Sequence, residues 1–561
     1  MLAERIAAQA WYHRSIPDLF DETCRLRGAR TALIFEGREI SFSDLHAQVQ
    51  QMAHALLRLG IGKGDVVCTL PSPTPEFAVL YFATLQVGAV VNPLNLLWGR
   101  LEFEGVLPRN RPAMIVTVDH YGGRDYIALL KEAIPDLHWD GEGRPSAASL
   151  PTLRHLVCLS RGGQRHAGFM DFEALREAGA GAHEPASAAV MEALLAAREP
   201  TEIQFICQTS GTTGLSKSAL WDHRPPLATV NFGAQAMGFD ETECYINLAP
   251  FYHNSGLYAL NMNLVLCGTP LVLMESFHPK LALELIDRHG CTSTFGFDAH
   301  WQAMRRVPDF ERYRFTIRKA ILAGEPKTYD LVRAMCPPGA TINNLYAQTE
   351  NGPLVSLAQH DCVDYQINKY THGRPLPGVR VVIKDIETGE RVPQGSSGEI
   401  CYSSPYMFRG YLAQEEATRA SYDAEGYFHS GDYGHFDGGY ITFLGRLGGV
   451  VKSGGENVST TRVSTLLLEH FADEFDDVKT IGVEDDYWGA RVVSFVRARE
   501  GCAVRSTAEL REACKGHLAA YEIPRDFLAW EGEWPVTAEG KINFKRLTER
   551  ARQLLAEGAA Q

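Results

Sequence analysis

The chain has 561 residues, of which 45% are hydrophobic and 22% are charged. These fractions are ordinary for a globular protein and exclude a disordered, collagen-like or disulfide-stapled chain, and the length suggests three or four folding units. Lys and Arg number 54 against 68 Asp and Glu, so the formal net charge is −14. Because a protein that coats duplex nucleic acid carries a basic excess, we expect no nucleic-acid partner.

The twelve cysteines are far apart, and no Cys-x-x-Cys pair occurs. This spacing disfavours a structural zinc site and is typical of reduced thiols in a cytosolic protein. Residues 77–99 carry no charge and are long enough to span a membrane, but polar residues, glycine and proline interrupt them. A buried helix that ends near Gly88, followed by a strand at 89–91, is therefore favoured over a membrane span. The N-terminus lacks an apolar signal core, and we expect a cytoplasmic location.

In chain order, residues 17–60 are predicted to be helical around a strand pair at 31–40 that turns at Glu36–Gly37, with Gly60 closing the second helix. Strands are then expected at 64–71, 114–119, 155–160 and 202–208. Their alternation with helices argues for α/β layers with parallel sheet.

Two later regions differ in composition. Residues 139–190 are rich in Gly, Ala, Pro and Ser, which predicts a surface excursion with one helix near 172–178. From 379 to 445, short strands with Gly turns predict an antiparallel or barrel-like piece. A compact α+β tail follows.

The most informative segment is Thr209–Lys217, with the sequence TSGTTGLSK directly after the strand at 202–208. Glycines permit a tight backbone, while hydroxyls, bare N–H groups and a lysine offer donors to phosphate. A phosphate-binding loop is therefore favoured over a Ser/Thr/Gly linker with no binding role. A Walker A motif fits poorly, because Ser216 stands in place of its second glycine.

This loop resembles the phosphate loop of the adenylate-forming superfamily, which comprises acyl- and aryl-CoA synthetases, peptide-synthetase adenylation domains and luciferases. The nearest members are the AMP-dependent acid–CoA ligases. Ser216 replaces the usual proline. Further motifs of the superfamily follow in the expected order over roughly residues 15–550: APFYHNSGL, LAGEP, YAQTE, YFHSGD, the glycine loop after Lys452, and PVTAEGKI.

The resemblance implies a site for ATP and Mg²⁺. Thr349 would hydrogen-bond the α-phosphate, Glu350 and Thr209 would hold the metal, and Asp432 would bind the ribose. Lys541 would bridge the substrate carboxylate and the α-phosphate. The implied ATP-binding residues are Thr209, Ser210, Gly211, Thr212, Thr213, Gly214, Lys217, Gly324, Glu325, Pro326, Tyr346, Ala347, Gln348, Thr349, Asp432, Arg446 and Lys541.

Catalytic roles are implied for Lys541, His253, Glu350 and Thr349. The acceptor site for a thiol would comprise His253, Lys452, Gly454, Gly455 and Glu456. The implied fold is α/β, with a large N-terminal domain (1–445) of layered α/β subdomains plus a β-barrel-like piece. A hinge (446–449) centred on Gly448 and a small mobile α+β C-terminal domain (450–561) would follow.

The chain departs from the family pattern at three places. The hinge, usually Arg-x-Asp-Asp or Arg-x-Lys-Asp, is Arg446-Leu447-Gly448-Gly449, so no charged side chain can hold one hinge state. The usual Glu-Ile-Glu becomes Arg462-Val463-Ser464. Asp298 lies in the acid-pocket segment, where it could be solvated, cap a helix or line the pocket. Asn254, Asn261 and Asn263 add polarity near His253. Together with Asp298, they favour a compact acid that tolerates polar surroundings over an acid with a long alkyl chain.

The resemblance implies ATP-dependent adenylation of a carboxylic acid, giving acyl-AMP and pyrophosphate, followed by transfer to CoA. The alternative is a different acceptor: a carrier-protein thiol, an amine, or a small inorganic nucleophile such as nitrite. A luciferase-like oxygenase and a catalytically silent ATP-binding scaffold are disfavoured. The sequence names neither the acid nor the oligomeric state.

Overall fold

A computed structural model describes residues 4–5, 10–70, 72–141, 143–180, 185–209, 216–453, 456–485, 488–515, 517–518, 520–536 and 542–559. The chain divides into two compact units, Met1–Val379 with Ser404–Ser421, and Arg380–Ser403 with Tyr422–Gln561. The hinge predicted at 446–449 lies inside the second unit, and the predicted domain boundaries on either side of it stay a prediction. None of the described helices is long and apolar enough to cross a membrane.

The start of the first unit follows its local sequence signals. Helix α3 (Ile16–Arg27) begins at Ser15, whose hydroxyl accepts the N–H of Asp18. The predicted hairpin is present as β1 (Thr31–Phe35) and β2 (Arg38–Ser41), and it turns at Glu36 and Gly37, which both have positive φ. Helix α4 (Phe42–Arg58) is capped at its N-terminus by Ser41, and its C-cap is Leu59, one residue before the predicted Gly60.

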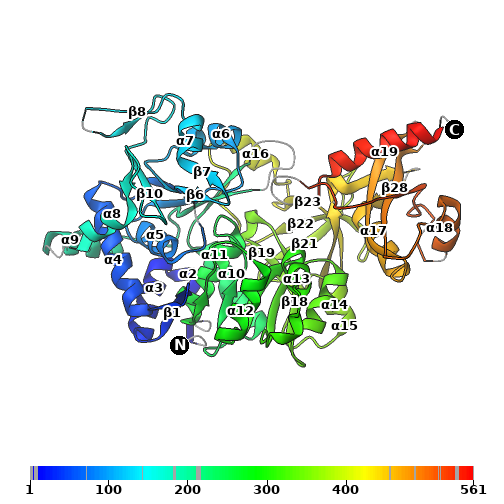
Figure 1. Cartoon of the computed structure of the whole chain (residues 1–561), viewed down its shortest axis with the longest axis horizontal. Helices are drawn as coiled ribbons and strands as arrows, with labels where there is room; N and C mark the ends of the chain where they lie inside the picture. The colour runs from blue at the N-terminus through cyan, green and yellow to red at the C-terminus, as the bar shows by residue number, and fades with distance from the viewer. Residues whose placement is uncertain are drawn as a thin grey trace. The chain divides into compact units, whose positions relative to one another are not determined.

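Two largely parallel sheets dominate the first unit (Figure 1). Within the described residues, the larger sheet has the order β2-β1-β15-β14-β16-β17-β18-β19-β20, and the smaller one β11-β10-β5-β3-β4-β12-β13. The remaining strands are β3 (Val66–Thr69), β4 (Val90–Pro93), β5 (Met114–Val118), β6 (His120–Tyr121), β7 (Arg124–Asp125), β8 (His138–Trp139), β9 (Pro145–Ser146), β10 (His155–Leu159), β11 (Met170–Asp171), β12 (Phe205–Gln208), β13 (Ser218–Trp221), β14 (Tyr245–Asn247), β15 (Leu271–Val272), β16 (Ser293–Phe297), β17 (Lys319–Ala323), β18 (Thr341–Ala347), β19 (Leu354–Leu357) and β20 (Arg374–Pro375).

Helices cover these sheets, and α4 packs against α3, α5 and α8, while α3 also packs against α5 (Figure 1). The other helices of the first unit are α2 (Ala10–His13), α5 (Pro75–Gln86), α6 (Arg100–Asn110), α7 (Tyr126–Ala133), α8 (Phe172–Ala180), α9 (Pro185–Ala196), α10 (Arg224–Met237), α11 (Asn254–Leu260), the π-helix η1 (Asn261–Cys267), α12 (Pro279–His289), α13 (Asp298–Arg305), the 3₁₀ turn η2 (Phe310–Arg312), α14 (Pro326–Met335), the 3₁₀ turn η3 (Thr349–Asn351), α15 (Tyr365–Tyr370) and α16 (Glu415–Ala420).

Two predictions in this region have clear outcomes. The uncharged segment is the buried helix α5 followed by β4, as predicted, and it packs inside the unit. The excursion at 139–190 contains α8 where one helix was expected, but α9 also begins in it, so the prediction of a single helix was wrong. The sequence of α9, PASAAVMEALLA, is rich in alanine, a strong helix former, and this signal outweighs the turn-like composition around it.

The second unit contains an antiparallel sheet and an α+β layer. The predicted short strands are β21 (Arg380–Lys384), β22 (Ser397–Ser403), β23 (Phe428–Asp437) and β24 (Tyr440–Arg446), in that order. After the 3₁₀ turn η4 (Leu447–Gly449) come β25 (Val450–Ser453), β26 (Glu456–Ser459), α17 (Thr460–His470), β27 (Phe475–Asp485), β28 (Gly489–Ala498), α18 (Thr507–Cys514), β29 (Asp526–Ala529) and α19 (Phe544–Ala559).

The two faces of the β27–β28 sheet are buried by different helices. Val478 and Val496 pack with residues of α17 and α18, whereas Ile481 and Val493 pack with Leu547 of α19. Period-two alternation along each strand produces this division.

One glycine fixes how the chain leaves β14 and enters α11. A Cβ at Gly256 would lie 2.4 Å from the Pro250 carbonyl oxygen and 3.0 Å from the Phe251 Cα, both of which belong to backbone that cannot move aside. Only glycine therefore allows α11 to start directly after the APFYH segment.

We expect Gly256→Ala to lower the melting temperature by several degrees, because overpacking a buried site costs about 1–3 kcal/mol. Gly62→Ala is the matched control, since no atom lies within 4 Å of the added Cβ there. Differential scanning fluorimetry of both variants tests this, and equal melting temperatures would contradict the steric argument.

Candidate active site

The predicted phosphate loop joins two adjacent antiparallel strands. Strands β12 and β13 pair from Phe205↔Trp221 to Gln208↔Ser218, so the loop leaves and re-enters the sheet at one edge. At its base the Thr209 N–H donates to the Lys217 carbonyl (2.9 Å), and the Lys217 N–H donates to Thr209 Oγ1 (3.2 Å). The predictions for Ser210, Gly211, Thr212, Thr213 and Gly214 lie outside the described residues.

Ser216, which departs from the family's proline, has a role at this base. Its hydroxyl donates to the Thr209 carbonyl, and its own carbonyl accepts a hydrogen bond from Arg109 of α6. Arg109 also donates to Ser218 Oγ (2.9 Å), and burial lowers the pKa of its guanidinium. The sequence carried no signal for Arg109, because its partners lie more than a hundred residues away.

A distant segment adds to the edge of β13. The Leu220 N–H donates to the Gly410 carbonyl (2.9 Å), and the Leu412 N–H donates to the Ser218 carbonyl (2.8 Å). Beside this pairing, the buried carboxylate of Asp222 accepts hydrogen bonds from Arg409, including one from Nε at 2.8 Å. Burial raises the pKa of Asp222 to about 6, and Arg409 opposes that rise.

This pairing places Tyr411 between two predicted site residues. The Lys217 Nζ lies 4.6 Å from the centre of the Tyr411 ring, within the range of a cation–π contact. The Tyr411 hydroxyl donates to Glu350 Oε1 at 2.7 Å. Tyr411 carried no signal in the sequence, and only the strand pairing reveals its position.

The YAQTE motif spans the end of β18 and the turn η3. Tyr346 and Gln348 are buried, while Ala347 is partly exposed. Thr349 is contacted from two sides, because the Trp221 indole N–H donates to its carbonyl (2.9 Å) and the Asn254 side-chain amide donates to its hydroxyl (3.1 Å).

His253 precedes α11 and caps it. Its Nδ1 accepts the Ser255 N–H (3.2 Å) and lies 2.7 Å from the Ser255 hydroxyl, and its ring meets that of Phe297 edge to face at 5.5 Å. Since Asn254 follows directly and contacts Thr349, the His253 and YAQTE motifs are joined in space. The first unit thus brings together Thr209, Lys217, His253, Thr349 and Glu350 through a chain of contacts.

The LAGEP loop is held by Asp298. The Glu325 N–H donates to Asp298 Oδ1 (3.1 Å), and the Asn344 side chain donates to the Gly324 carbonyl (3.1 Å). A Cβ at Gly324 would lie 2.3 Å from Asp298 Oδ1, so glycine permits this approach, and Pro326 then begins α14. Of the three roles considered for Asp298, solvation and helix capping are wrong: the N-cap of α13 is Phe297, and the Asp298 carboxylate binds the loop backbone. Burial, with Glu325 nearby, raises its pKa to about 6.

In the second unit, Asp432 and Arg446 are paired across β23 and β24. Arg446 Nη1 lies 3.0 Å from Asp432 Oδ1, and the Asp432 N–H donates to Ser430 Oγ (3.0 Å). Asp432 is buried while Arg446 is exposed, so the pair joins the interior of the sheet to its surface. Gly448 follows in the turn η4.

The remaining predicted residues are only partly described. Lys452 lies on β25 and Glu456 on β26, whereas Gly454, Gly455 and Lys541 lie outside the described residues. The altered positions after the hinge do have partners: Arg462 Nε donates to Glu522 (2.9 Å), and Ser464 Oγ accepts the Thr480 N–H (2.8 Å).

Comparisons with known proteins agree with these motifs. A family model described as AMP-binding enzyme matches residues 20–412. The putative acyl-CoA synthetase YngI of Bacillus subtilis is 27% identical over 98% of this chain and 99% of its own. The medium-chain acyl-CoA ligase ACSF2 of Rattus norvegicus is 26% identical over 97% and 88%. The solved anthranilate CoA ligase AuaEII has a TM-score of 0.80 at 22% identity, over 97% of this chain and 98% of its own.

The fold of AuaEII extends over nearly the whole of this chain, so the predicted α/β class is confirmed. The relatives are acyl-CoA synthetases and ligases, which supports acid adenylation followed by transfer to CoA over other acceptors. Since the family model covers more than half of the residues, the resemblance drawn from the motifs is confirmed, and the chain belongs to the AMP-binding enzyme family.

Proposed function

We propose that this protein is an AMP-forming acid–thiol ligase that converts a carboxylic acid and ATP to acyl-AMP and pyrophosphate, then transfers the acyl group to CoA. The observation that carries the proposal is the contact chain Lys217–Tyr411–Glu350 at the base of the phosphate loop. A cation and a carboxylate joined through one tyrosine suit a site where nucleotide phosphates and a divalent metal meet.

The donors in this region fit Mg²⁺. Glu350 offers a carboxylate and Thr209 a hydroxyl, which are the hard oxygen ligands that Mg²⁺ prefers. When bound, Mg²⁺ neutralises charge on the phosphates of ATP. Tyr411 holds Glu350 by one oxygen, so the direction of this carboxylate is set before substrates bind.

The other residues bind and orient the two substrates. Lys217 neutralises phosphate charge, the Thr349 hydroxyl donates to the α-phosphate, and the Gly324–Pro326 loop borders the adenine. Asp432 accepts hydrogen bonds from the ribose hydroxyls. The acid attacks the α-phosphorus in line and pyrophosphate leaves, with Lys541 offsetting the repulsion between the two anions.

For the second half-reaction we propose that the chain turns about Gly448, so that the loop 454–459 replaces Lys541 and a thiol approaches beside His253. Glycine changes φ and ψ at little steric cost, which suits a hinge position that has no charged side chain to stabilise one state. A carrier-protein thiol or an amine is the alternative acceptor.

The test is ATP–pyrophosphate exchange over a panel of short, medium-chain and aromatic acids, followed by mass spectrometry with and without CoA. We expect acid-dependent exchange, and a thioester only when CoA is present. In Lys541→Ala, exchange should fall by about 10²–10³, the scale of losing one oriented donor to a developing charge. Exchange with no acid dependence would refute adenylation, and adenylate without thioester would refute CoA as the acceptor.

Tyr411→Phe should keep the ring beneath Lys217 but remove the hydrogen bond to Glu350. Because hydrogen bonds to charged groups contribute about 1.5–3 kcal/mol, we expect roughly a tenfold or larger loss of exchange, and a higher Mg²⁺ requirement. Tyr406→Phe is the matched control, since the Tyr406 hydroxyl also donates within the first unit, to the Pro377 carbonyl. If both variants had wild-type Mg²⁺ dependence, Tyr411 would not orient Glu350.

Asp298→Asn should change how stability depends on pH. Since the pKa of Asp298 is raised to about 6, its stabilising proton is present below the unfolded pKa of about 4 and is lost as pH rises through 6. Asn cannot ionise yet keeps an oxygen for the Glu325 N–H, so the variant should gain stability relative to wild type as pH rises from about 4 to 6 and keep that gain at higher pH. Melting temperatures across this range, with exposed Asp309→Asn as control, test this. A constant difference would contradict it.

A further inference from the structure

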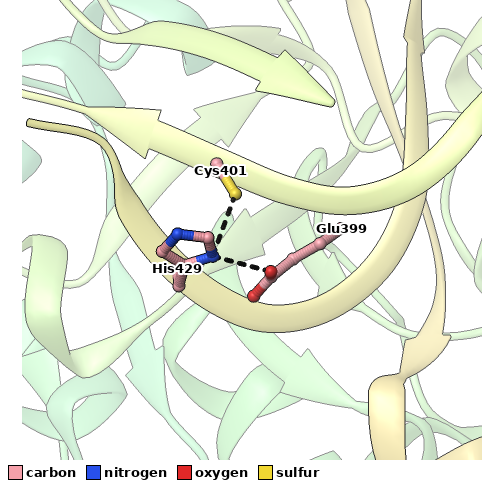
Figure 2. A group of neighbouring side chains, drawn as sticks. All are labelled: Glu399, Cys401 and His429. Carbon is pink, nitrogen blue, oxygen red and sulfur yellow. Dashed lines mark hydrogen bonds and ion pairs between the residues drawn. The ribbon is translucent and has the colours of Figure 1, made fainter. Parts of the chain in front are cut away.

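Three side chains in the second unit converge on one face of the β22–β23 pair (Figure 2). Glu399 and Cys401 are two residues apart on β22 and therefore point to the same face, and His429 on β23 lies directly opposite Cys401. Figure 2 shows one ring nitrogen of His429 facing both the Cys401 sulfur and the Glu399 carboxylate. Among the described residues, this is the one group of three or more His, Cys, Asp and Glu whose ligand atoms all lie within 4.8 Å of one another.

The distances suit a small cation. His429 Nδ1 lies 2.7 Å from Glu399 Oε2 and 3.6 Å from Cys401 Sγ. Ordinary zinc–nitrogen, zinc–sulfur and zinc–oxygen bonds at tetrahedral angles place N and S about 3.6 Å apart and N and O about 3.3 Å apart. The sulfur is already at the required distance, and the carboxylate needs to retreat by only about 0.6 Å.

The donor types select the kind of metal. One thiolate, one imidazole and one carboxylate favour Zn²⁺ and similar thiophilic cations, whereas Mg²⁺ prefers oxygen ligands alone. Cys401 is fully buried, Glu399 is nearly so, and the side chain of His429 is 32% exposed, which leaves an approach from solvent. Three ligands leave the fourth position to water.

We propose that Glu399, Cys401 and His429 bind one Zn²⁺ or a cation of the same thiophilic class. On binding, the Cys401 thiol loses its proton to solvent, and the proton that His429 Nδ1 shares with Glu399 is replaced by the metal while Nε2 carries the ring proton. No electron transfer is involved.

The site is coupled to the residue proposed to bind ribose. Opposite Glu399 and Cys401, β23 bulges, because Cys401 pairs with His429 and Glu399 with Tyr433. Inside this bulge the Gly431 N–H donates to Glu399 Oε1 (2.9 Å), and Asp432 follows. Movement of Glu399 onto a metal would therefore shift Asp432. This consequence rests on the proposed function, whereas metal binding itself does not.

Cobalt is the probe for the site, because Co²⁺ accepts the same ligands and a bound thiolate gives a charge-transfer absorption band. With the full chain and no nucleotide, we expect this band to saturate at one Co²⁺ per chain and to be displaced by Zn²⁺ but not by Mg²⁺. Cys401→Ser should remove it, and Cys502→Ser should keep it, since Cys502 is an exposed thiol of the same unit. His429→Asn should weaken Zn²⁺ binding at least tenfold, since loss of even an outer-sphere partner costs 10- to 100-fold.

Absence of the band in the wild type, or its survival in Cys401→Ser, would refute the metal site. The three residues would then only stabilise the bulge of β23 through their hydrogen bonds. In a separate assay, Zn²⁺ added under excess Mg²⁺ should inhibit ATP–pyrophosphate exchange in the wild type but not in Cys401→Ser. Equal inhibition of both proteins would refute the coupling to Asp432 while the cobalt result stands by itself.

Discussion

The pairing of β13 with residues 408–412 is the constraint on which the site in the first unit depends. Backbone hydrogen bonds add this segment to the sheet edge, and the buried carboxylate of Asp222 holds Arg409 beside them. Asp222 is fully buried, whereas Arg409 is exposed and Arg224 pairs with the same carboxylate, so the ion pair adds to the attachment that the backbone hydrogen bonds already make. Without it, Tyr411 would contact neither Lys217 nor Glu350, and the phosphate loop and the YAQTE motif would be independent parts.

The motifs themselves were predictable because each is local. A run of hydroxyls and glycines after a strand, or a carboxylate at the end of one, is visible within nine residues of sequence. The contacts that join them were not predictable: Asp222 and Arg409 are 187 residues apart, and Arg109 reaches Ser218 across 109 residues. An isolated tyrosine such as Tyr411 gives no signal in the sequence, because its role comes from strand pairing alone.

Two residues that depart from the family pattern after the hinge, Arg462 and Ser464, have hydrogen-bond partners in the structure. In the sequence, Arg462 and Ser464 stand out as two carboxylates lost from the family pattern. Arg462 is paired with the nearly buried Glu522, and Ser464 accepts a backbone N–H of the neighbouring strand β27. Both residues are therefore held by contacts within the second unit.

The asparagines near His253 also have partners within the first unit. Asn261 exchanges two hydrogen bonds with Tyr81, Asn263 bonds to Ala259 and Thr269, and Asn254 donates to Thr349. A buried amide with its partners already in place gains little from a substrate, and it costs free energy to separate. These asparagines therefore stabilise the π-helix η1 and orient Thr349. The sequence alone gave no means of separating an amide that stabilises a helix from one that faces a substrate.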